Sequence, residues 1–164
     1  MVVPILRRLN AAMALRPALQ GWTFAIGNAE ASKPAERRLH WEFGKADAPR
    51  GGYQADRRAK TIIIRQVPLT AVIRVRRPAG PTGAPGLTDA DYLAAEMAHR
   101  ELFIALDAEC SGDWAAEGED WTETGSTPGE SCIVLRQPLT IAVKTQQDDY
   151  ATARVESQEA NRNE

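Results

Sequence analysis

The sequence predicts an α+β domain in which two main helices pack on one face of an antiparallel or mixed β-sheet. Two segments carry apolar residues at helical spacing, and two long segments are rich in β-branched residues that alternate with polar ones. Their order along the chain is helix, strands, helix, strands, which is typical of an α+β domain. The length of 164 residues, 43% of them hydrophobic, suits a single domain.

The first helix is predicted over residues 4–16. Pro4 suits the first helical position, and the apolar residues that follow form one stripe: Ile5, Leu6, Leu9, Ala12 and Met13. A half-buried strand is expected next at 22–26, because Trp22, Phe24 and Ile26 alternate with smaller or polar residues.

Residues 28–60 are predicted to form a long extended arm, with a short strand around Leu39 to Phe43. Large apolar residues are sparse there, and their burial cannot offset a backbone ordering cost of about 1–2 kcal/mol per residue. We therefore expect the arm to be mobile in a free subunit and ordered in an assembly. Its expected anchors are Trp41, Phe43 and Tyr53.

The clearest strand signals are residues 61–77 and 131–145, both rich in Val, Ile and Thr. Pro68 is expected to mark an edge, a bulge or a bend between two shorter strands. Between these segments, a second helix is predicted over 88–109, with Thr88 as its N-cap and acidic residues in its first turn. The domain is thus placed at 1–146, and the polar residues 147–164 are expected to be a frayed tail.

Charge is unevenly distributed along the chain, although the formal net charge is only −2. Residues 30–60 hold eight basic and five acidic residues, whereas residues 107–130 hold eight acidic residues and no basic one. Such polarity suits head-to-tail contact between copies or docking onto charged partners. The alternative is two solvated loops of opposite sign.

No catalytic, metal or cofactor motif is apparent. The two histidines and the two cysteines are far apart, and no nucleophile, base and orienting group can be combined. We therefore expect neither an enzyme nor a bound cofactor or metal, and the acidic cluster is interpreted as a solvated loop rather than a cation site. No apolar run is long enough for a membrane span.

The order of elements, together with several short segments, resembles a known family. These segments are an N-terminal helix with paired arginines, VIRVRR at 72–77, TDAD at 88–91, ELFIALDAE at 101–109 and QPLTIAVKT at 137–145. Over about residues 1–146 the chain resembles the tail terminator, or tail completion, proteins of long-tailed bacteriophages.

The resemblance implies a structural protein of the virion tail or neck, assembled in the host cytoplasm. It would form a hexameric ring at the head-proximal end of the tail tube, stop tube polymerisation and present a surface for head–tail joining. The implied partners are further copies of the chain, the major tail tube protein and a head-completion or connector protein, and DNA would only pass through the lumen.

Eleven residues are expected to make subunit or tail-tube contacts: Arg37, Arg38, Trp41, Phe43, Tyr53, Arg57, Arg58, Tyr92, Phe103, Glu117 and Glu119. The alternative function is a head–tail connector or head-completion protein of the neck. Further alternatives are a small nucleic-acid-binding module that uses the arginines, and a small enzyme whose site carries no known motif.

Overall fold

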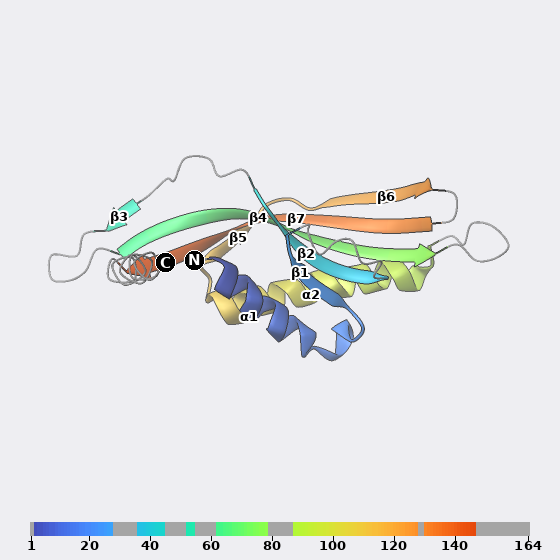
Figure 1. Cartoon of the computed structure of the whole chain (residues 1–164), viewed down its shortest axis with the longest axis horizontal. Helices are drawn as coiled ribbons and strands as arrows, with labels where there is room; N and C mark the ends of the chain where they lie inside the picture. Colours follow the sequence, from blue (N-terminus) through green and yellow to red (C-terminus); the bar gives the residue numbers. More distant parts are fainter. Residues whose placement is uncertain are drawn as a thin grey trace, which may run out of the picture.

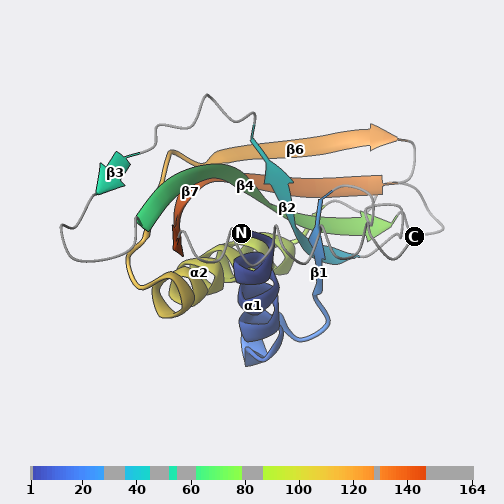
Figure 2. The ribbon, with the colours of Figure 1, turned by 60° about the vertical axis from the view of Figure 1, so that its left-hand side comes forward.

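The computed structural model describes residues 2–27, 36–44, 52–54, 62–78, 87–127 and 130–146. This part of the chain forms one seven-stranded sheet with both α-helices on the same face (Figures 1 and 2). The elements, in chain order, are α1 (Val2–Ala14), the 3-10 helix η1 (Pro17–Leu19), β1 (Thr23–Ile26), β2 (Arg37–Phe43), β3 (Gly52–Gln54), β4 (Ile62–Pro78), α2 (Asp89–Cys110), β5 (Trp114–Ala116), β6 (Asp120–Thr127) and β7 (Glu130–Gln146).

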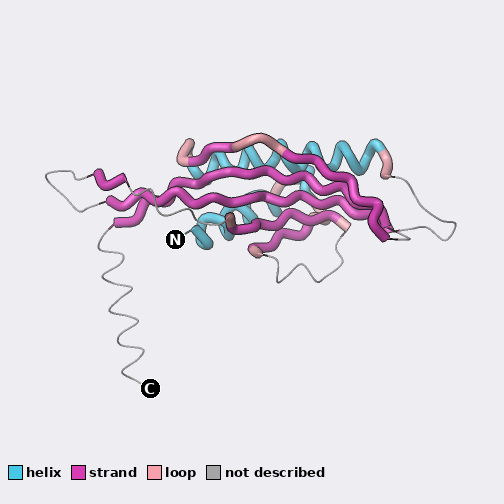
Figure 3. The backbone as a smooth tube through the Cα atoms, turned by 90° about the horizontal axis from the view of Figure 1, so that it is seen from above, coloured by secondary structure: helices cyan, strands magenta, loops and turns pink. Residues whose placement is uncertain are grey.

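The sheet is mixed, with the strand order β1-β2-β4-β7-β5. Strands β4 and β7 are its spine and pair antiparallel along their whole length, from Ile62 opposite Gln146 to Pro78 opposite Glu130 (Figure 3). Strands β1 and β2 form the parallel pair, β3 lies beside the start of β4, and β6 lies beside the first half of β7. The predicted α+β fold, with a mixed sheet and helices on one face, is confirmed.

Prolines determine where the flanking strands stop, and they do not split the long strands. The Pro68 carbonyl accepts a hydrogen bond from Gly44 N, which ends the β2 side of the β4 ladder. The Pro138 carbonyl likewise accepts from Glu117 N, at the break between β5 and β6. In an antiparallel ladder the backbone N and O of one residue point to the same neighbouring strand. The side of Pro68 and Pro138 that lacks an N–H therefore faces the end of β2 or the break between β5 and β6, and not the β4–β7 ladder. Of the alternatives expected for Pro68, the division into two shorter strands is wrong, because β4 is continuous. Pro68 instead lies at an edge, where the pairing of β4 with β2 ends.

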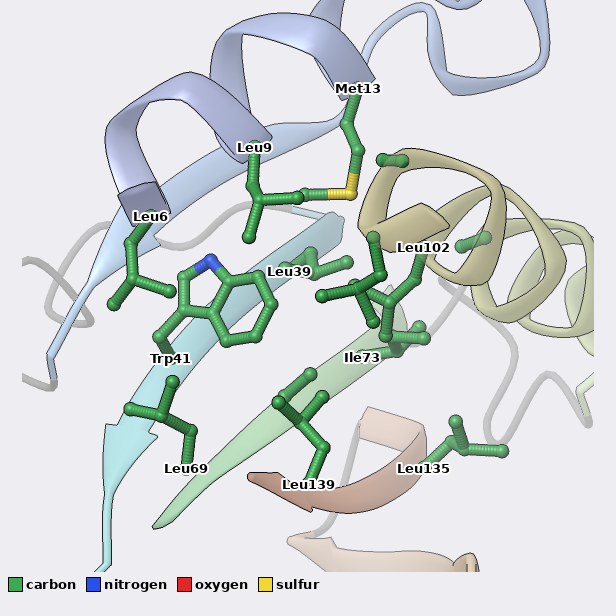
Figure 4. Close-up of a cluster of buried hydrophobic side chains, with 14 of the residues drawn as sticks. Leu6, Leu9, Met13, Leu39, Trp41, Leu69, Ile73, Leu102, Leu135 and Leu139 are labelled. Atoms are coloured by element: carbon green, nitrogen blue, oxygen red, sulfur yellow. The ribbon is translucent and has the colours of Figure 1, made fainter. Parts of the chain in front are cut away.

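The helices bury the stripes that the sequence predicts. Helix α1 buries Leu6, Leu9 and Met13, and α2 turns a face of alanine and leucine toward the sheet. Thr88 caps α2 in a capping box with Asp91, and Ser111 ends the helix in the left-handed region at φ 48°. These faces meet the inner sides of β2, β4 and β7 in one core (Figure 4).

Two segments differ from expectation. The short strand expected around Leu39 to Phe43 is present as β2, but it lies inside the sheet between β1 and β4, so the expectation of an extended arm is wrong for Arg37–Phe43. The acidic segment 107–130, whose acidic cluster is interpreted from the sequence as a solvated loop, contains β5 and β6, which pair with β7. The rest of the predicted arm, apart from residues 36, 44 and 52–54, and the predicted tail at 147–164 lie outside the described residues.

Candidate interaction surfaces

Trp41 lies in the core rather than at a contact surface. Its side chain has no solvent exposure, and its indole Nε1–H donates to Asn10 Oδ1 of α1 at 2.8 Å. The prediction that Trp41 anchors an arm to a neighbouring subunit is therefore wrong. Phe43, two residues further along β2, is 49% exposed and remains available for contact. The side chain of Tyr53 and residues Arg57 and Arg58 lie outside what the structure describes.

The aromatic residues of α2 pack within the subunit. Phe103 stacks edge-on against His99, with 4.7 Å between ring centroids, and lies 5.3 Å from the ring of Trp114. Tyr92 is half-buried against the core. Both side chains, which are expected to make subunit or tail-tube contacts, are thus partly covered within the subunit, Phe103 by Trp114 of β5 and Tyr92 by the core.

The exposed apolar residues of α2 lie elsewhere on the helix. Leu93, Met97 and Ile104 are 55%, 40% and 36% exposed. Their spacing of four and seven residues places them on one side of the helix, away from the buried alanines. This apolar stripe, rather than Phe103, is the part of α2 that another chain can reach.

An acidic edge borders the sheet at β5 and β6. Glu117 and Asp120 are exposed and form no ion pair with any described residue, whereas Asp113 pairs with Lys144 at 2.8 Å. Glu119 lies 3.3 Å from His99 Nδ1 and also accepts from Trp121 Nε1. The acidic edge is thus partly neutralised within the subunit, and Glu117 and Asp120 are its available charges.

A polar network fixes this edge to α2. Gln137 is only 2% exposed, and its amide nitrogen donates to the carbonyls of Glu117 and Pro138 at 2.6 and 2.8 Å. Its oxygen must then accept from His99 Nε2–H, at 2.8 Å. His99 consequently turns Nδ1 toward Glu119 and ties the break between β5 and β6 to the helix.

The sheet face opposite the helices carries an arginine cluster. Every second residue of three adjacent strands lies on this face, and the strand register places these residues beside one another. They are Arg38, His40 and Glu42 of β2, Arg74 and Arg76 of β4, and Arg136 of β7. We call this set the arginine face. Arg38 is the one member of this set that is predicted from the sequence as a contact residue. The alternation of arginines in VIRVRR indicates one face of a strand, but only the sheet register brings Arg38 and Arg136 beside them.

Glu42 and His40 occupy the centre of the arginine face. Arg136 donates to Glu42 at 2.7 Å, and His40 Nε2 lies 3.3 Å from the same carboxylate. Burial alone would raise the pKa of Glu42, but these hydrogen bonds outweigh it and lower that pKa. Burial lowers the pKa of His40, its contact with Glu42 opposes this effect, and the charges of Arg38 and Arg74 add to it.

Arg37 points to the other side of β2, toward the start of α2. It lines a cavity of about 200 Å³ with Arg77 and Asp91. Arg77 forms a two-bond ion pair with Asp91 at 2.8 and 2.9 Å, and Asp91 also accepts from the backbone and hydroxyl of Thr88. The hydrogen bonds from Arg77 hold the pKa of Asp91 well below its usual range. This arrangement anchors the helix to β4.

The described residues offer little else for chemistry. Among them, no group of three His, Cys, Asp or Glu side chains is placed to hold a metal ion. Cys110 and Cys132 are both buried, and they form no disulfide with each other. Within the same part of the chain, no helix is long and apolar enough to cross a membrane.

No model of a known protein family matches this chain, and no curated protein matches its sequence.

Proposed function

We propose that the chain is a ring-forming structural protein that closes the head-proximal end of a phage tail tube, ends tube polymerisation and provides the surface for head–tail joining. The observation that supports this most directly is the acidic edge at β5 and β6, where Glu117 and Asp120 are exposed and form no ion pair with a described residue. Residues 2–27, which form α1 and β1, hold three arginines and no acidic residue, and two of these arginines, Arg7 and Arg8, are exposed.

Such an arrangement suits contact between two different patches of identical subunits. Arg8 and Arg16 pair with Glu109 and Glu101 of α2, but Arg7 has no acidic partner among the described residues. Edge strands also leave backbone groups that a neighbour can pair with. Head-to-tail contacts of this kind close into a ring when the rotation between subunits allows it.

Apolar contacts must supply most of the affinity, because an exposed ion pair contributes only about 0–1 kcal/mol. The apolar stripe of Leu93, Met97 and Ile104 and the exposed Phe43 are available for this. Charge would then set the direction of assembly around the ring. Both contributions are testable with single substitutions.

The direct experiment adds the purified chain to the major tail tube protein while tubes polymerise. We expect rings of six subunits by native mass spectrometry, and tubes of limited length with the chain at one end by electron microscopy. A chain that stays monomeric at all concentrations and leaves tube growth unchanged would overturn the proposal. Binding to the head vertex instead of the tube would identify a neck connector.

A charge reversal tests the acidic edge. Glu117→Lys should weaken ring formation mainly at low ionic strength, where screening is least. Glu96→Lys is a comparison at a different surface, because Glu96 is an exposed residue of α2 beside the apolar stripe and away from this edge. If Glu117→Lys forms rings as well as the wild type at low ionic strength, the acidic edge is a solvated surface without a role in assembly.

A further inference from the structure

The arginine face contains two neighbouring positive charges that have no counter-charge among the described residues. Arg38 and Arg74 are directly opposite each other on β2 and β4. Neither forms an ion pair or hydrogen bond with a described residue through its side chain, and the Nε of each is buried without a partner. Arg38 is only 5% exposed. Like charges directly opposite on adjacent strands destabilise a sheet, and a buried charge without a partner does so strongly.

Glu42, the acidic residue of β2 on this face, does not neutralise the charges of Arg38 and Arg74. Both Glu42 oxygens are engaged, Oε2 by Arg136 and Oε1 by His40. His40 is 3% exposed, and its Nδ1 is buried without a partner. The centre of the arginine face therefore has two guanidinium groups and one imidazole nitrogen with unused hydrogen-bonding capacity.

We propose that Arg38 and Arg74 form a binding site for a phosphate group. A phosphate carries a charge of about −1.5 to −2 near pH 7, which balances two guanidinium charges, whereas a carboxylate would balance one. Its oxygens also match the planar donor pattern of arginine, which commonly makes paired hydrogen bonds to phosphate. This proposal is independent of the ring proposal, because both arginines belong to one subunit.

The burial of the site favours a free phosphate or the terminal phosphate of a small ester. A backbone diester has sugars on both sides and carries a single charge, so it fits poorly against a guanidinium that is 95% buried in a sheet face. Inorganic phosphate and a nucleoside monophosphate share the required chemistry. Comparing the two shows whether the ester adds affinity.

The test measures the binding of inorganic phosphate to the full chain at constant ionic strength. Calorimetry gives the affinity, and the Nε–Hε signals of arginine in NMR spectra show which arginines are involved. The expected result is saturable binding that shifts the Arg38 and Arg74 signals. Arg38→Met and Arg74→Met should each weaken binding at least tenfold. Arg65→Met is the matched control, because Arg65 is exposed and lies on the same strand as Arg74. It should change binding less than twofold.

Thermal unfolding distinguishes lost binding from lost folding. Without phosphate, Arg38→Met should be at least as stable as the wild type, because it removes a buried charge that has no partner. With phosphate, only the wild type and Arg65→Met should gain stability. Loss of binding in Arg65→Met equal to that in Arg38→Met would overturn the proposal. So would absence of saturable binding, or tighter binding of duplex DNA at equal phosphate concentration.

Discussion

The burial of Trp41 makes a sharp prediction about the free subunit. Trp41 contacts the apolar side chains of α1 and the neighbouring strand positions, including Leu6, Leu9 and Leu39, and it has no solvent exposure (Figure 4). Its indole N–H is satisfied by Asn10 of α1. Replacing it with alanine removes the largest fully buried side chain among the described residues and should leave a cavity between α1 and β2.

The expected cost is large compared with the stability of a domain. Truncating a buried tryptophan to alanine costs about 3–5 kcal/mol, whereas a whole domain is stable by about 5–15 kcal/mol. Asn10→Ala leaves the buried indole N–H without its acceptor and should cost about 1–3 kcal/mol. Phe43→Ala is the control, because Phe43 is 49% exposed and its loss should cost on the order of 0.5 kcal/mol.

The assay is urea unfolding of the dilute, unassembled chain, followed by circular dichroism. Trp41→Ala should lower the midpoint strongly, and the slope should be unchanged for a two-state transition. Wild-type tryptophan fluorescence should include a solvent-shielded component before any assembly. The reasoning would be refuted if Trp41→Ala left the free subunit as stable as Phe43→Ala does and impaired only assembly, because residues 37–43 would then order only in the ring.

Three further predictions concern polar contacts. Asp91→Ala removes both the capping box with Thr88 and the ion pair with Arg77, so it should lower the free energy of unfolding by at least about 0.5–2 kcal/mol, as measured by urea unfolding. His99→Ala should cost about 1–3 kcal/mol, because it leaves the buried Gln137 oxygen without its donor, and hydrogen exchange should accelerate at residues 117–119. The stability of the folded chain should fall as the pH drops below 6.5, the ordinary pKa of histidine. The reason is that folding lowers the pKa of His40, so the unfolded chain binds a proton there more readily than the folded chain does.

Each of these predictions has its own control. Asp89→Ala removes an acid from the same helical turn but outside the capping box, and an equal loss of stability would assign the effect of Asp91→Ala to the helix dipole. Unchanged exchange at residues 117–119 in His99→Ala would show that the contact with Glu119 does not hold this segment. For the pH effect, His40→Gln should flatten the fall in stability below pH 6.5. In the wild type this fall amounts to about 1.4 kcal/mol for each tenfold difference in the proton affinity of His40 between the unfolded and the folded chain. An unchanged profile would contradict the assignment to His40.

The sequence by itself determined the elements that depend on neighbours along the chain. The apolar stripe of α1, the small-residue face of α2 and the N-cap at Thr88 are local signals, since residues three or four apart meet on a helix whatever lies around them. The long strands β4 and β7 were also predictable, because their β-branched residues favour extended backbone over their whole length. Element order then sufficed for the fold class.

Only the tertiary structure decided what depends on pairing between distant segments. The alternation of Leu39, Trp41 and Phe43 fits an exposed arm and a central strand equally well, and only the pairing of β2 with β1 and β4 places Trp41 in the core. The arginine face was hidden for the same reason. Arg38 and Arg74 are 36 positions apart, and the register of β2 on β4 makes them neighbours. Strand register is a long-range property, because a shift of one residue would turn every one of these side chains to the opposite face.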